Sequence, residues 1–484
     1  MKKILGVMLA ILCSVTSIFP LTSCQKTQKP NTRYEITCEY VPENRTVTGT
    51  VKVTFKNPTD RVLELLKFQL YPNAYRKGAL FSPISPVYTD SAYYAGESFG
   101  EMVISSVHGS KNWEIMGEDE NILYVYLERS LFPDESVVLD IGFMTKLAQV
   151  NHRTGETERA VNLGNFFPTL CAIRGNAFVE TVYYPIGNPF LFEVSDYKVT
   201  LTLPKEYTVA STGNFLEERM LESKKVHTMY AMNARDFAMV LSDNAQKLSA
   251  KSGNTELVYC YYADTTPQET LALIQECFAF YEKVFGKYPY DVYTVAETGF
   301  CKEGATYPGL LMLSDRLQNE EKTWSIAKQT AHQWWRCVVG SDTLENAWQD
   351  EGMGAYSALL FFEEYEKYGF AREEIIKQAL EEYRSYFDVY GSVLGRTDTR
   401  MTRSLGEYIS EFEYRCLSHD KALLLLDTLR KSVGEEKFLQ ALRRYYAEQT
   451  FKVASVGDMV ASFEKTGMDV SGLFDSFLQG KGVL

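Results

Sequence analysis

The chain changes its hydrophobic pattern about halfway along its length. From Tyr34 to about Lys251, short β-branched and aromatic runs alternate with polar residues, as in 46–55 and 197–203. Successive side chains of a strand point to opposite faces, so this period of two predicts strands with one buried face. Turn residues separate the runs. Many short strands joined by turns predict a sandwich or saddle-shaped sheet domain.

After Cys260 the apolar residues recur at helical spacing. The first such run covers residues 267–286, and further helices are expected over 324–339, 351–368, 372–387, 420–432, 435–448, 455–465 and 470–479. A Ser/Gly/Asn-rich segment at 251–256 marks the junction. The predicted fold class is therefore α+β. An N-terminal β-sandwich or saddle domain covers 34–250, and a mainly helical domain covers 251–484.

The first residues have the pattern of a targeting segment. Lys2 and Lys3 precede an apolar run, which ends in Leu-Thr-Ser before Cys24. This resembles the lipobox of bacterial lipoproteins, in which the cysteine is acylated. The resemblance implies a signal peptide over 1–23, a lipid on Cys24, a flexible tether over 24–33 and a place on the extracytoplasmic face of a bacterial cell membrane. The alternative is an ordinary secretory signal with Cys24 as an incidental thiol.

Charge and cysteine content narrow the possible partners. The formal net charge is −13, which argues against nucleic acid and against electrostatic attraction to anionic lipid. Of the nine cysteines, one lies in the targeting segment and one is Cys24. The others are odd in number and form no C-x-x-C pair, so the sequence indicates neither a disulfide framework nor a cysteine metal site.

The informative segment runs from residue 326 to 356. It contains His332-Gln-Trp and, with eighteen residues between histidine and glutamate, Asp-Glu351-Gly. It resembles the metal-binding core of the membrane alanyl aminopeptidase family, which includes leukotriene hydrolase. In that family one helix carries H-E-x-x-H-x-W, whose two histidines share a face and reach one zinc. A second helix supplies a glutamate as third ligand. The resemblance implies a gluzincin with a thermolysin-like, mainly helical domain.

The sequence departs from this pattern at the residues that perform the chemistry. His332 matches the second histidine, and Glu351 matches the third ligand. Lys328 stands at the first ligand position, where an ammonium offers no lone pair to a metal. Gln329 stands at the general-base position, where an amide cannot accept a proton at neutral pH. These departures predict a catalytically inactive member of the family that needs no cofactor.

Two further motifs complete the resemblance. Gly304, Ala305, Thr306 and Tyr307 resemble the family's substrate-edge strand, but the glutamate that binds the substrate's amino group is replaced by Thr306. An extended peptide can pair with the edge of such a strand. The segment 414–422 resembles a Tyr-x-Lys-Gly helix start, whose tyrosine stabilises the oxyanion. His419 aligns with that tyrosine, and Tyr414 is the alternative.

Several interpretations of this constellation stay open. Lys328 and Glu351 can form a buried ion pair in place of a metal, or His332, Glu351 and His419 can make a rebuilt zinc site. The first function hypothesis is a membrane-tethered protein that binds a peptide or envelope protein in the old substrate cleft. The alternatives are an active zinc-dependent metallopeptidase with a non-standard metal site and a purely structural envelope lipoprotein.

Overall fold

The computed structural model describes residues 29–395 and 397–481. The predicted signal peptide and the lipidated Cys24 lie outside this part of the chain, and the predicted tether overlaps it only from residue 29. Strand β1 (Thr32–Val41) already begins inside that tether. Among the described helices, none combines the length and apolar content that crossing a bilayer requires.

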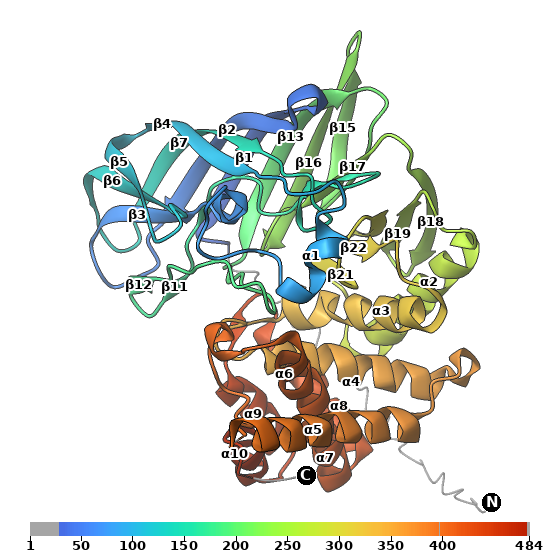
Figure 1. Cartoon of the computed structure of the whole chain (residues 1–484). Coiled ribbons are helices and arrows are strands. Elements are labelled where there is room, and N and C mark those ends of the chain that lie inside the picture. The colour runs from blue at the N-terminus through green and yellow to red at the C-terminus, as the bar shows by residue number, and fades with distance from the viewer. Residues whose placement is uncertain (1–28, 396, 482–484) are drawn as a thin grey trace, which may run out of the picture.

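The N-terminal domain is built on a large curved sheet, confirming the predicted β-rich half (Figure 1). Its strand order is β15-β16-β13-β1-β2-β7-β4. The bounds are β2 (Thr46–Lys56), β4 (Glu101–His108), β7 (Ser136–Lys146), β13 (Ser195–Pro204), β15 (Asn214–Met220) and β16 (Lys224–Ala234). Strand β1 buries Tyr34, Ile36 and Cys38 on one face, as its alternation predicts.

Smaller sheets cover the concave face of this sheet. One has the order β10-β3-β6-β5, with β3 (Leu63–Gln69), β5 (Ser110–Met116), β6 (Ile122–Leu131) and β10 (Thr169–Leu170). Another joins β14 (Thr208–Ser211), β17 (Met239–Ser242), β9 (Val161–Leu163) and β8 (Thr154–Glu156). One buried apolar cluster includes Ile36, Val51, Phe68 and Leu139, so these layers share a core.

The second domain opens with its own sheet, in the order β18-β19-β20-β22-β21. Its strands are β18 (Gln246–Ser252), β19 (Thr255–Tyr261), β20 (Val292–Thr298), β21 (Gly304–Tyr307) and β22 (Leu310–Ser314). The predicted boundary at residue 250 falls inside β18, which pairs with β19. Strand β21 is an edge strand, as expected for the segment compared with the substrate edge.

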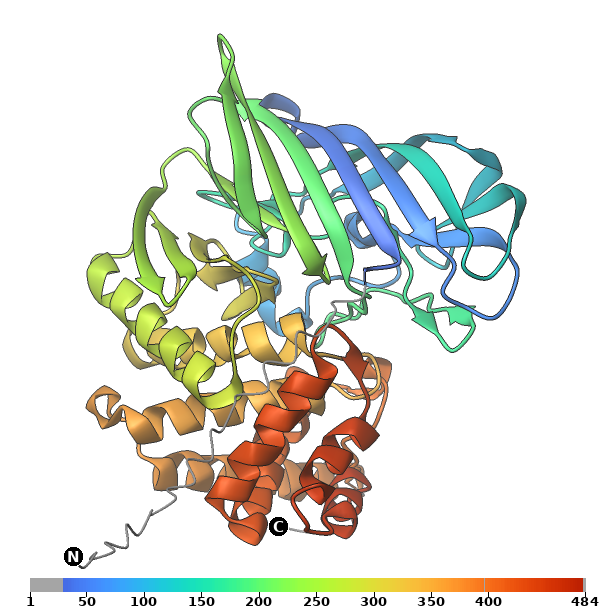
Figure 2. The same cartoon turned by 180° about the vertical axis from the view of Figure 1, so that it is seen from behind.

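Helices complete the second domain below the large sheet (Figure 2). They are α2 (Pro267–Phe285), α3 (Asn319–Ala331), α4 (Trp348–Glu364), α5 (Arg372–Leu394), α6 (Glu411–Arg415), α7 (Lys421–Val433), α8 (Glu435–Gln449), α9 (Val456–Glu464) and α10 (Ser471–Leu478). The predicted helix over 324–339 begins earlier and breaks near its end. A wide turn, η4 (Gln333–Val338), follows α3, and Trp335 has a non-helical backbone there. This break redirects the chain after His332.

Arg235 joins the two domains at their seam. Its guanidinium donates to the carbonyl of Phe192 in the β domain at 3.2 Å. It also donates to the carbonyl of Val338 at 3.2 Å and to that of Lys452, both in the helical domain. The side chain is buried. Since buried carbonyls need donors, Arg235 serves both domains at once.

Candidate functional site

Helices α3 and α4 bring the motif residues together. Lys328 and Gln329 lie in the last turn of α3, and His332 caps its C-terminus. Glu351 lies in the first turn of α4, where the helix dipole favours a carboxylate. The packing is close, because a Cβ on Gly354 would lie 2.2 Å from Nε2 of His332. All four motif side chains are largely buried.

Lys328 forms an ion pair with Glu303, not with Glu351. Its Nζ lies 2.9 Å from Oε2 of Glu303, and the two side chains are 5% and 46% exposed. Burial alone would raise the pKa of Glu303, but the Lys328 ammonium holds it below its usual value. The predicted Lys328–Glu351 pair is therefore wrong. Glu303, just before β21, reaches the ammonium first.

Arg336, and not Lys328, is the basic residue that forms the ion pair with Glu351. Its Nε lies 2.6 Å from Oδ2 of Asp350, and its Nη2 lies 2.6 Å from Oε1 of Glu351. Burial raises the pKa of Asp350 to about 6 despite this partner. Sequence reasoning missed Arg336, although it stands four residues after His332. The break in η4, where the Arg336 backbone is extended, hides this relation from helical periodicity.

Two imidazoles face the other oxygen of Glu351. Nε2 of His419 lies 3.2 Å from Oε2, and Nε2 of His332 lies 3.9 Å from the same atom. Burial lowers the pKa of His419 to about 4 and that of His332 well below its usual value. Both rings are therefore neutral at pH 7. Within the described part of the chain, Nε2 of His332 has no hydrogen-bond partner. The structure thus brings His332, Glu351 and His419 together.

Gln329, at the general-base position, is tied to the edge strand. Thr306 donates its hydroxyl to Oε1 of Gln329 at 2.7 Å, and Nδ1 of His332 lies 3.2 Å from the same oxygen. The next residue, Gln333, donates to the carbonyl of Tyr307 at 3.0 Å. The sequence differs from the family pattern at both Gln329 and Thr306, and these two side chains contact each other through the amide of Gln329 and the hydroxyl of Thr306.

His419 and Tyr414 occupy neighbouring places, with ring centroids 5.8 Å apart. His419 contacts Glu351 directly. Tyr414 lies behind it, where a Cβ on Gly187 would meet its ring. Burial raises the pKa of Tyr414 well above its ordinary value, and its hydroxyl has no hydrogen-bond partner among the described residues. His419 is thus the residue presented to the ion-pair cluster.

A cavity of about 660 Å³ opens in front of these residues. Glu303, Lys328 and His419 contribute to its lining. Its apolar lining residues include Trp324, Phe370, Ile375, Ala379 and Leu423, and its charged ones include Arg316, Glu382 and Arg415. None of the predicted cleft residues Gly304, Ala305, Thr306 and Tyr307 lines it, and Thr306 and Tyr307 line a separate small space beside Arg336. The size is typical of a site for a small ligand.

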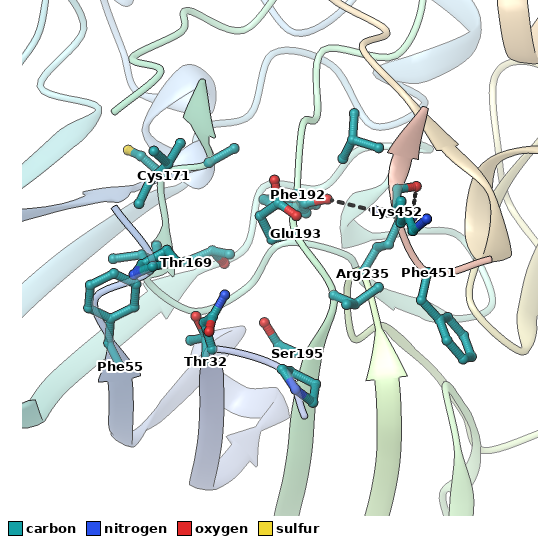
Figure 3. Close-up of a pocket in the computed structure, with 18 of the residues that line it drawn as sticks. Thr32, Phe55, Thr169, Cys171, Phe192, Glu193, Ser195, Arg235, Phe451 and Lys452 are labelled. Carbon is teal, nitrogen blue, oxygen red and sulfur yellow. Dashed lines mark hydrogen bonds between the residues drawn. The ribbon is translucent and has the colours of Figure 1, made fainter. Parts of the chain in front are cut away.

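A second cavity of about 640 Å³ lies at the seam between the domains. Figure 3 shows Thr169, Cys171 and Phe55 on one side of it and Arg235 with Lys452 on the other. None of the motif residues on α3 and α4 belongs to its lining. It is therefore a separate feature from the candidate site.

Comparison with known proteins decides the family. Residues 270–477 match the model of the peptidase family M1 domain. This chain contains an M1-family domain. Human endoplasmic reticulum aminopeptidase 2 is 24% identical to it over 340 residues, which are 65% of this chain and 33% of the relative. The M1 chain thus spans about a third of that relative's length.

Solved structures extend the likeness to both domains of this M1 protein. The M1 zinc metallopeptidase of Deinococcus radiodurans has a TM-score of 0.66 at 16% identity, covering 94% of this chain and 96% of that one. A mutant of it bound to a Tyr-Ser-Ala substrate has a TM-score of 0.64 at 17% identity, covering 94% of both chains. The two-domain α+β fold is confirmed.

These neighbours contradict the expectation that the site needs no cofactor. They are zinc metallopeptidases, so the fold points to zinc. The donor set of this M1 chain fits zinc incompletely. Across residues 29–395 and 397–481, no group of three His, Cys, Asp or Glu side chains is placed to hold a metal. His332 and Glu351 keep the second and third ligand positions, but Lys328 brings a cation to the first and Arg336 binds one oxygen of Glu351.

Proposed function

We propose that this M1 protein binds peptides in the cavity beside Lys328 and does not hydrolyse them by the family's mechanism. The observation that supports this most strongly is the state of Gln329. At the general-base position, its amide oxygen accepts a hydrogen bond from Thr306 at 2.7 Å. An amide cannot take a proton from water at neutral pH. Without a general base, the site cannot activate water for hydrolysis even when zinc is bound.

The ion pair in the cleft supports the same proposal. The ammonium of Lys328 lies at the position of the first ligand, 2.9 Å from Glu303. Burial lowers the pKa of Lys328, but Glu303 and Glu351 together raise it above its usual value, so the ammonium stays charged. A fixed cation here repels a second cation. The cleft is thus suited to holding a ligand and poorly suited to activating water.

Peptide is the ligand class that the surroundings favour. The edge strand β21 can pair with an extended backbone, and the apolar side chains in the cavity lining, Trp324 among them, can contact a side chain of the peptide. A structural neighbour with 17% identity is bound to a Tyr-Ser-Ala substrate. We include in the proposal that the chain is anchored by lipid at Cys24, so that the peptide belongs to an envelope protein.

Paired assays of hydrolysis and binding test this proposal. We expect unblocked tripeptides to bind the purified protein by calorimetry, with no aminopeptidase hydrolysis above background when zinc is supplied. The double variant Lys328→His/Gln329→Glu restores the family's donor and base. We expect it to bind zinc at least roughly tenfold more tightly than the native chain, since a cation becomes a ligand.

Two outcomes separate the alternatives. Hydrolysis by the native chain that zinc supports and a chelator abolishes would contradict the proposal and favour the active metallopeptidase. Failure of the native chain to bind any peptide would favour a structural envelope role. Trp324→Ala, which removes a ring from the cavity lining, is the matched binding variant, because it leaves the ion pairs unchanged.

A further inference from the structure

Strand β15 (Asn214–Met220) is an unprotected edge of the large sheet. It pairs with β16 on one side and ends the strand order on the other. Six of its seven residues are exposed. With β16 it forms a hairpin that extends past the rest of the sheet (Figures 1 and 2). An open strand edge carries unpaired amide and carbonyl groups, which favours pairing with another chain.

Large apolar side chains gather on this hairpin without cover. Leu216 is 63% exposed, Met220 is 57% exposed and Leu221, in the turn that follows, is 45% exposed. Single exposed apolar side chains are common and need no explanation, but three large apolar side chains on one short strand edge form a patch. Proteins usually protect such an edge with a charge or a covering loop. On β15 the charged side chains are of both signs and do not form a single repulsive charge.

Glu217 and Arg219 carry opposite charges two residues apart on the same face of β15, opposite Thr228 and Val226 of β16. Neither has an ion-pair partner among the residues that the structure describes. When two identical strands pair antiparallel about a two-fold axis, side chains that lie on one face of the first strand neighbour side chains on the same face of the second strand. A register centred on Glu218 places Glu217 of each copy opposite Arg219 of the other.

We propose that β15 pairs antiparallel with β15 of a second copy of this chain, in the register centred on Glu218. The register makes two opposite-charge pairs and places Leu216 of each copy near Met220 of the other. Cross-strand pairs of these kinds stabilise a sheet. The seven-stranded sheets of the two copies then form one continuous sheet.

The central position is unfavourable and makes the proposal specific. Glu218 faces its own copy across the axis, and directly opposed like charges destabilise a strand pair. A contact of two short strands is also smaller than the interface of a permanent dimer, so the association is weak and depends on concentration. The register thus predicts that removing the charge of Glu218 strengthens the dimer.

Sedimentation velocity of the purified protein over a range of concentrations tests the pairing. We expect a concentration-dependent dimer, and Glu217→Arg or Arg219→Glu alone should raise its dissociation constant roughly tenfold by opposing like charges twice. The double variant Glu217→Arg/Arg219→Glu should restore association to near the native value. Glu218→Gln should tighten it severalfold. Lys111→Glu, on the exposed edge strand β5, is the matched control and should change nothing.

The double variant makes the test independent of folding, since it contains both changes and should recover. Circular dichroism and thermal unfolding confirm that each single variant keeps the native fold. A chain that stays monomeric at every concentration would overturn the proposal. So would a dimer that is insensitive to the two single changes, because it would use another surface, or a double variant that fails to recover.

Discussion

The two sides of the motif helices differ in a way that separates scaffold from chemistry. On the packed side, Trp334 is fully buried and donates to the carbonyl of Gly286 at 2.9 Å. Trp335 donates to the hydroxyl of Ser357 at 3.0 Å. On the cavity side stand Lys328 and the other residues that depart from the family pattern. The packed side keeps what the fold needs, and the cavity side has changed.

This contrast shows why a family fold persists after its reactive residues are replaced. The ring of Trp334 contacts those of Phe278, Tyr281 and Tyr288. A change there leaves a void in a close-packed core. Lys328 and Gln329 are also buried, but a change at either removes polar contacts and leaves this ring packing intact, so it alters chemistry at a smaller cost in stability.

The largest effect expected is the loss of the packed tryptophan. Trp334→Ala should lower the free energy of unfolding by about 3–5 kcal/mol, since it removes buried ring contacts and a hydrogen bond. Trp324→Ala on the cavity side should cost no more than about half as much, because that ring is only partly buried. Urea unfolding of both variants measures the difference. Equal losses would remove the distinction between the two sides.

A pH series sharpens the comparison between paired and unpaired buried carboxylates. Glu351 lies in the charge network, where burial alone would raise its pKa, but the attraction of the neighbouring positive charges, Arg336 among them, holds it well below the usual value. Asp236 is fully buried with hydrogen bonds from Asn165 and a backbone amide, and burial raises its pKa to about 7. Between the unfolded value near 4 and 7, the folded state binds more protons at Asp236 than the unfolded state does.

Stability should therefore fall as pH rises through that window, by an amount on the order of 3 kcal/mol from Asp236. Asp236→Asn should flatten this part of the profile, because the amide does not ionise. Asp243→Asn, at an exposed position, serves as the control and should leave the slope unchanged. Thermal unfolding between pH 4 and pH 7 gives the three slopes. Equal slopes for the native chain and Asp236→Asn would show that Asp236 ionises freely.

The smallest effect concerns the two partners of the cleft ion pair. Glu303→Gln leaves the buried Lys328 ammonium with a weaker partner, and we expect a loss of about 1–2 kcal/mol. The half-exposed position of Glu303 keeps this figure low. Lys328→Met should cost less than about 1 kcal/mol, since Glu303 can then turn to water. Urea unfolding of the two variants tests the order of these losses, which would be reversed if Glu303 were the buried partner.

Periodicity predicted most of the fold because it depends only on local burial. The alternation of Tyr34, Ile36 and Cys38 and the helical spacing of 267–286 reappear in β1 and α2. Contacts between side chains across the cleft could not be predicted from periodicity. Lys328 meets Glu303 from another element, and the break after His332 turns Arg336 toward Glu351. Motif spacing identifies which positions meet. Which charge pairs with which depends on side-chain reach in three dimensions.

Arg235 gives the molecule a mechanical property as well as a satisfied set of carbonyls. Its planar guanidinium donates hydrogen bonds to the backbone carbonyls of Phe192, Val338 and Lys452 and so links the β domain to the helical domain. A hinge at that seam would have to strip three carbonyls of their donor together. The seam around Arg235 therefore resists opening, and the two domains keep one relative position there.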